Sequence, residues 1–144
     1  MITPHPTSRI DPLLARGVMG QPLPATATRQ AHLTFLVPNT NYELHLLGAD
    51  GVQTAPGKRL IGTIRVEARR IDIVQTGGQY MEPVIGRPRR MQGTIIAVRD
   101  GAVVVDAGVP VHATPTDPRQ SAEDFKPGQF VTFEVKEGAA FVTG

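Results

Sequence analysis

The sequence contains no cysteine among its 144 residues. This absence excludes disulfide bonds, thiolate metal sites, a cysteine nucleophile and cysteine-ligated iron–sulfur clusters. Packing and hydrogen bonding must therefore stabilise the fold. A chain of this length has room for one ordinary domain, or for two very small barrels that share a core.

Long apolar runs are also absent, since no segment approaches the roughly 18 consecutive apolar residues that a membrane span requires. The N-terminus lacks the basic stretch and apolar core of a secretory signal. We therefore expect a soluble, cytoplasmic protein that makes no contact with a membrane.

The composition favours strands joined by many turns, because 15 glycines and 13 prolines accompany abundant Val, Ile and Leu. Residues 1–30 contain five prolines and small polar residues, which indicates a flexible or surface-draped arm. We assign residues 31–88 to a first β module, which is either an OB-like barrel or an extended sheet. Its strands are expected at 32–37, 42–47, 59–67, 71–75 and 80–85.

Residues 89–144 contain the clearest pattern of the chain. Asp100-Gly101 favours the positive φ of a tight hairpin turn, and Ser121 can cap one helical turn within the connector 114–126. Three strands, this connector and two more strands follow the order of a five-stranded Greek-key OB barrel. The predicted fold class is therefore all-β, with two small modules of which the second is an OB-like barrel. The strands of that barrel are expected at 91–98, 102–106, 109–113, 129–136 and 139–143.

Two motifs in this segment carry a family resemblance. They are G-T-I-I-A-V-x-D-G-A-V-V-V-D at 93–106 and E-D-F-K-P-G-Q-F-V-T-F-E-V at 123–135. Together they resemble the RNA-binding barrel repeats of S-one type in bacterial ribosomal and RNA-processing proteins. The RNA-binding members expose aromatic residues on the second and third strands. This chain departs from that pattern, because Val103, Val104 and Val105 stand there and His112 is the only planar ring.

The formal net charge of +2 hides an uneven distribution. Between Lys58 and Arg99 nine basic residues face Glu67, Asp72 and Glu82, whereas after Arg99 three basic residues face seven acidic ones. This bipolar arrangement permits a polyanion-binding face, a head-to-tail self-contact or internal salt bridges.

Six arginines form the candidate binding site, because guanidinium groups match the geometry of phosphate oxygens. Tyr80 is a candidate for base stacking. The competing interpretation is that these arginines pair with the acidic C-terminal strands or are simply solvated. The six are Arg65, Arg69, Arg70, Arg87, Arg89 and Arg90.

No catalytic, metal or cofactor site has a specific signature in this sequence. Glu43 and His45 share one face of a strand, but a metal site would need further ligands. The glycine-containing segments 55–58 and 76–78 match neither a phosphate loop nor a dinucleotide fingerprint, and there is no Gly-x-Ser-x-Gly elbow. We therefore expect no enzymatic activity, no cofactor and no metal.

Two functions from different classes remain. The protein is either a binding module for single-stranded RNA, DNA or another polyanion, or a structural or assembly protein. In the second case the β modules and the N-terminal arm would contact a protein partner or other copies of the chain. Fold analogy alone does not decide between them.

Overall fold

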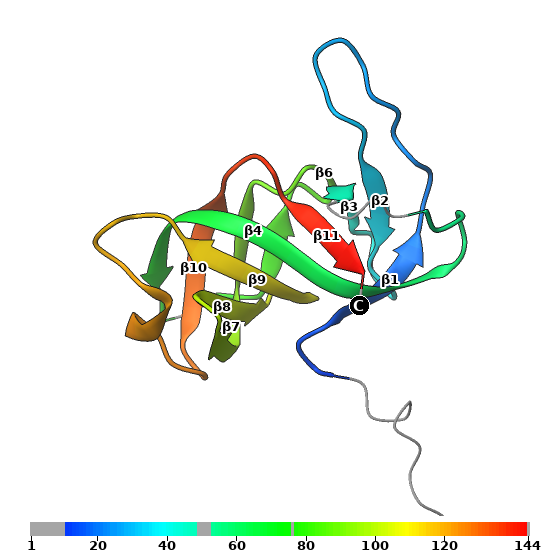
Figure 1. The fold of residues 1–144 in the computed structure, drawn as a ribbon. Coiled ribbons are helices and arrows are strands. Elements are labelled where there is room, and N and C mark those ends of the chain that lie inside the picture. Colours follow the sequence, from blue (N-terminus) through cyan, green and yellow to red (C-terminus); the bar gives the residue numbers. More distant parts are fainter. Residues whose placement is uncertain (1–10, 49–52, 76, 144) are drawn as a thin grey trace, which may run out of the picture.

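The computed structural model describes residues 11–48, 53–75 and 77–143, and within them the fold is all-β with no α-helix, as predicted (Figure 1). Residues 1–10 of the expected arm lie outside the described residues. The elements are β1 (Ala15–Met19), β2 (Leu33–Leu36), β3 (Glu43–Gly48), β4 (Arg59–Ile73), β5 (Tyr80–Glu82), β6 (Ile85–Gly86), β7 (Arg90–Arg99), β8 (Ala102–Asp106), β9 (Pro110–Pro115), a 3-10 turn (Ala122–Asp124), β10 (Phe130–Val135) and β11 (Ala140–Thr143).

Five strands close into a barrel, which we name the C-terminal barrel. In ring order these strands are β4, β10, β7, β8 and β9, and β9 returns to β4. The β4–β9 pairing is parallel and the other four are antiparallel. This closed five-stranded ring is consistent with an OB-like barrel.

The strand that closes the C-terminal barrel is not the predicted one. The expectation that 139–143 closes it is wrong, because β11 pairs with β3 and with the N-terminal half of β4. The place is taken by the C-terminal half of β4, which pairs with β9 at Arg65↔His112 and with β10 at Ile71↔Phe133. Since β4 precedes β7 in the chain, the barrel is a circular permutation of the predicted strand order.

A second ring of pairings uses the N-terminal half of β4, and we name it the N-terminal ring. It runs from β1 through β2, β3 and β11 to β4, and β4 pairs again with β1. The assignment of residues 15–19 to an arm is therefore wrong. Ala15 and Met19 alternate with exposed or half-buried neighbours and are buried, as in a strand with one face on a core. The division of the chain at residue 88 stays a prediction.

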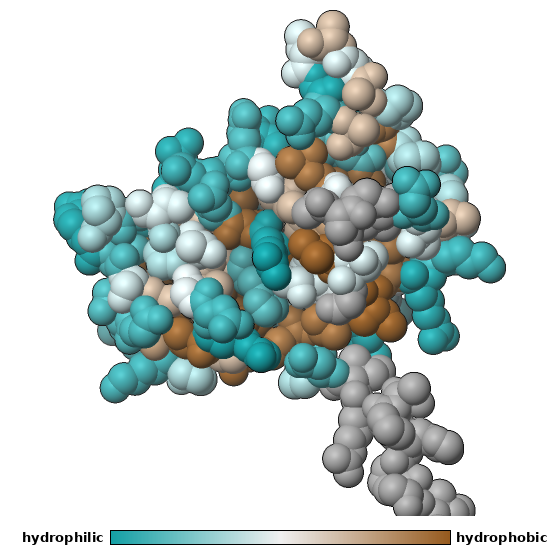
Figure 2. All heavy atoms as spheres, viewed as in Figure 1, coloured by the Kyte–Doolittle hydropathy of each residue, from teal (hydrophilic) through white to brown (hydrophobic). Residues whose placement is uncertain are grey.

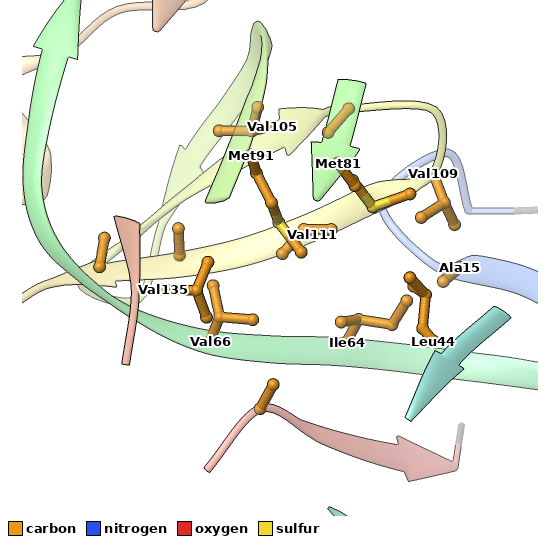
Figure 3. Packing of buried hydrophobic residues seen from close by; sticks show 14 of the residues in the cluster. Ala15, Leu44, Ile64, Val66, Met81, Met91, Val105, Val109, Val111 and Val135 are labelled. Carbon is orange, nitrogen blue, oxygen red and sulfur yellow. The ribbon is translucent and has the colours of Figure 1, made fainter. Parts of the chain in front are cut away.

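The two rings are joined by β4, which was predicted as two strands but continues over 15 residues. From Arg59 to Arg69 its inward side chains alternate with outward ones, as the two-residue period of a strand requires, and the alternation is interrupted at Arg70. Figure 3 shows Ile64 beside Leu44 of the N-terminal ring, and Val66 beside Val135 of the C-terminal barrel. All four belong to a single cluster of buried residues, so the two rings share one core.

The connector between β9 and β10 binds the end of β4 through a side chain. The Gln120 Oε1 accepts a hydrogen bond from the Ile71 N–H at 2.9 Å, and the Gln120 Nε2 donates to the Ile71 C=O at 2.7 Å. The last pairing of β9 with β4 is at Pro115 and Ala68. The Gln120 amide therefore satisfies backbone groups of β4 beyond the point where the neighbouring strand stops.

We expect Gln120→Ala to lower the free energy of unfolding by about 2 kcal/mol, since each of two part-buried hydrogen bonds contributes about 1 kcal/mol. Gln120→Glu is the matched comparison of equal size. Its carboxylate keeps the acceptor but sets a second acceptor oxygen against the Ile71 C=O, so a loss at least as large is expected. Urea denaturation measures both values. Equal stabilities of Gln120→Ala and the wild type would contradict this role.

Candidate polyanion-binding surface

The arginine-rich segment 87–90 is held in place by its backbone. The Arg89 N–H donates to the Glu82 C=O, and the Arg89 C=O accepts from the Val135 N–H, both at 2.8 Å. Arg90 then begins β7. Because these bonds tie the segment to the ends of β5 and β10, its arginine side chains extend from a fixed stretch of backbone.

Four of the six predicted arginines line one surface hollow of about 810 Å³, which we name the central hollow. Arg87, Arg89 and Arg90 come from the segment described above, and Arg69 comes from β4. The carboxylates of the same hollow are Glu82, Glu134 and Glu137. The structure thus brings together arginines that are up to 21 positions apart in the sequence.

Three of these arginines face carboxylates, as the competing interpretation proposed. The shortest nitrogen–oxygen distances are 3.2 Å for Arg90–Glu134, 3.7 Å for Arg87–Glu137 and 4.0 Å for Arg69–Glu134. The Glu134 and Glu137 side chains are 57% and 85% exposed, and solvated pairs of this kind contribute about 1 kcal/mol or less. Phosphate groups can therefore compete for these guanidinium groups. Within the described residues, the Arg89 side chain has no ion pair.

Arg70 lies in an adjoining hollow of about 540 Å³, which we name the distal hollow. Its other cations are Arg69, Arg119 and Lys136. Arg70 pairs with Asp72 at 2.9 Å. A hydrogen bond from the Arg119 side chain lowers the pKa of Asp117 to about 2, so this carboxylate stays ionised beside Arg119. Of the cations in the distal hollow, Arg70 and Arg119 are thus partly neutralised.

Residues 20–32 form a protruding hairpin, which lies in the upper part of Figure 1. A third hollow, of about 750 Å³, lies beside this hairpin, and we name it the hairpin hollow. Leu23 and His32 bridge the hairpin, and the Thr26 N–H donates to the Arg29 C=O at 2.8 Å near its tip. The spheres of this hairpin range from hydrophilic to hydrophobic in Figure 2. Its hollow is lined by Leu23, Thr28, Arg29, Gln30, His32, His45, Leu47, Arg87, Arg89, Glu137 and Gly138.

The three hollows adjoin one another through shared lining residues, and we name them together the basic track. The hairpin and central hollows share Arg87 and Arg89, and the central and distal hollows share Arg69. The cations that line the track are twice as numerous as its carboxylates. The carboxylates are Glu82, Asp117, Glu134 and Glu137. The cations are Arg29, Arg69, Arg70, Arg87, Arg89, Arg90, Arg119 and Lys136.

Sequence reasoning missed three of these cations and included one arginine that lies elsewhere. Arg29 was placed in the arm, and Arg119 and Lys136 were counted with the acidic C-terminal third. The signal for Arg119 was its position in the turn after Asp117-Pro118. Arg65 lines a different hollow, together with Arg99, Asp100 and His112.

Aromatic side chains offer no exposed stacking surface. All seven lie within the described residues, where Phe35, Phe125, Phe133 and Phe141 are buried and Tyr42, Tyr80 and Phe130 are half-buried. Val103, Val104 and Val105 are fully buried as well. The second and third strands of the C-terminal barrel therefore present no aromatic ring to solvent, unlike those of the RNA-binding members. Only half-buried rings are left for base stacking.

In the chain from residue 11 to residue 143, apart from 49–52 and 76, we find no group of three or more His, Cys, Asp or Glu side chains placed to hold a metal ion. Over the same residues no helix has the length and apolar character to cross a membrane.

Comparisons with known proteins found no match, whether to family models, to curated proteins or to solved structures. The resemblance to repeats of S-one type therefore gains no support from them. The functional argument depends on the closed barrel and on the composition of the basic track.

Proposed function

We propose that the protein is a binding module for a single-stranded nucleic acid or another extended polyanion, which lies along the basic track. The observation that carries the proposal is a row of three adjoining hollows whose lining residues include twice as many cations as carboxylates. A flexible polyanion can follow such a path, and each neutralised phosphate releases condensed counterions. The proposed role is binding rather than catalysis.

The chemistry of the track favours phosphate groups over bases. Seven of its eight cations are arginines, whose planar guanidinium groups can form two parallel hydrogen bonds with a phosphate. Stacking on aromatic rings contributes roughly 1 to 3 kcal/mol per base in proteins that bind single strands, and that contribution is missing here. Binding should therefore depend little on base sequence.

We expect labelled single-stranded DNA and RNA to bind with affinities that fall steeply as salt is added. If about five phosphates are neutralised, the slope of log K against log salt concentration is about −3.5. Fluorescence anisotropy at a series of salt concentrations measures the slope, with unlabelled inorganic polyphosphate as a competitor that has no bases. Failure of all three anions to bind at low salt would exclude the proposal.

A second candidate function, protein assembly, is favoured by exposed apolar side chains. Val84 and Ile85 are adjacent and are 49% and 58% exposed, and Ile73 is 55% exposed. Because residues 15–19 form β1, removal of residues 1–30 would disrupt the N-terminal ring. Truncation of the N-terminal segment is therefore no clean test of assembly, and a surface variant is used instead. Sedimentation velocity compares the intact chain with Val84→Ser/Ile85→Ser, and assembly requires the intact chain to sediment as the larger species.

A further inference from the structure

The hairpin hollow brings two histidines together with arginines from two separate parts of the chain. His45 comes from β3, and His32 immediately precedes β2. Arg29 lies near the tip of the hairpin, and Arg87 and Arg89 come from the segment before β7. Sequence analysis assigned no role to this group, because its members are separated by up to 60 positions.

The hydrogen bonds of the two imidazole side chains leave nitrogen atoms available to a ligand. The His32 Nδ1 lies 2.7 Å from the Gln30 C=O, and since a carbonyl only accepts, this nitrogen carries the proton. This bond holds the His32 ring in one orientation beside the hollow. The ring of His45 forms no hydrogen bond with the residues that the structure describes.

The charges that face His45 are mostly positive. Burial lowers the pKa of His45 from its ordinary value, and nearby His32 and Arg29 lower it further, whereas Glu43 on the same strand raises it. The other charged groups in the hollow are Arg87, Arg89 and Glu137. His45 is therefore mainly neutral at pH 7 in the free protein, and a bound anion would favour its protonated form.

We propose that the hairpin hollow binds a phosphodiester group of the polyanion and that His45 adds to its positive charge by taking up a proton, so that binding strengthens as the pH falls. This inference depends on the proposed function and extends it to the N-terminal ring. The hairpin contributes Arg29 to the lining, and the segment before β7 contributes Arg87 and Arg89. These three arginines outnumber Glu137, the one carboxylate among the described residues of the hollow.

The direction of the effect follows from proton linkage. A bound phosphodiester raises the affinity of the His45 imidazole for a proton, so acidification drives binding across the range where histidine titrates. An increase of one unit in the pKa of one histidine on binding corresponds to a tenfold gain in affinity. A phosphodiester keeps its charge over this range, so the change comes from the protein.

The test is the affinity for labelled oligothymidylate, whose bases do not titrate in this range, at constant salt from about pH 8 to about pH 5.5. We expect binding to become about tenfold tighter over the range in the wild type. In His45→Gln the gain should fall to about twofold or less. The matched control is His112→Gln, since His112 lies outside the hollow and bonds to the Leu13 C=O, and it should keep the tenfold gain.

The outcomes separate this inference from the proposed function. No binding at any pH would exclude both. Tight binding that is independent of pH, or a gain that survives in His45→Gln, would overturn the inference and leave the proposed function standing. Ring resonances of His45 in NMR spectra provide a second readout, because the midpoint of their titration should move to higher pH when oligothymidylate is added.

Discussion

Gly93→Ala should destabilise the protein by at least about 3 kcal/mol, which is a large part of the stability of a typical small domain. Gly93 lies in β7, where β8 approaches its backbone closely. A Cβ at this position would overlap the Asp106 carbonyl oxygen, and it would lie 2.7 Å from the Asp106 carbonyl carbon and 3.0 Å from the Ala107 Cα. All three are backbone atoms, so no rotamer change relieves the contact.

The matched control is Gly78→Ala. A Cβ on Gly78 would have no atom within 4 Å, and its backbone is outside the left-handed region that disfavours L residues. We expect its stability to stay within about 0.5 kcal/mol of the wild type. Urea denaturation of both variants measures the difference. Equal stabilities of Gly93→Ala and Gly78→Ala would mean that β7 and β8 do not approach as closely as the barrel requires.

Local sequence signals predicted the strands of the C-terminal segment well. The hairpin between β7 and β8 turns at Asp100 and Gly101, whose φ angles of 54° and 76° are those that Asp-Gly favours. The helical turn expected after Ser121 is present, and the Asp124 Oδ2 accepts a hydrogen bond from the Ser121 N–H at its start. In each case the residues that determine the structure are neighbours in the sequence.

The closure of the rings could not be predicted in the same way. Residues 139–143 have the length and alternation of a barrel strand, and nothing local distinguishes pairing with β10 from pairing with β3 and β4. β4 was divided because Ala68-Arg69-Arg70 contains two consecutive exposed arginines, which interrupt the alternation of buried and exposed residues. Prolines on both sides of β1 suggested an arm, although Ala15, Gly17 and Met19 face the core.

The candidate site was predicted only in part, for the same reason. The cluster Arg87, Arg89 and Arg90 is local and was visible in the sequence. Its continuation into a track depends on the closure of two rings, which places Arg29 of the hairpin and Arg119 of the connector on either side of it. Charge counting along the chain cannot show which distant cations share a surface.

Replacement of Arg87, Arg89 and Arg90 by alanine should weaken the binding of single-stranded DNA by about 100-fold at low salt. These three residues line the central hollow, and two of them also line the hairpin hollow. Their loss removes about three phosphate contacts and leaves Glu134 and Glu137 to repel the ligand. Fluorescence anisotropy measures the affinity. Replacement of the same three arginines by lysine keeps the positive charge. That variant should retain most of the affinity and lose only the part that comes from bidentate hydrogen bonds.

The matched control for charge is a second triple variant, in which Arg16, Arg59 and Arg65 are replaced by alanine. None of these arginines lines the basic track, since Arg16 and Arg59 lie in one separate hollow and Arg65 lies in another. This variant loses the same three positive charges, so long-range attraction falls equally. We expect its affinity to fall by about threefold at most, and circular dichroism should show both variants folded.

The difference in salt dependence between these two triple variants tests most directly whether the polyanion binds along the basic track. If the polyanion lies along the basic track, loss of three phosphate contacts at Arg87, Arg89 and Arg90 should make the slope of log K against log salt concentration shallower by about 2. The control triple should keep the slope of the wild type. Equal slopes in the two variants would contradict the claim that this track holds the ligand.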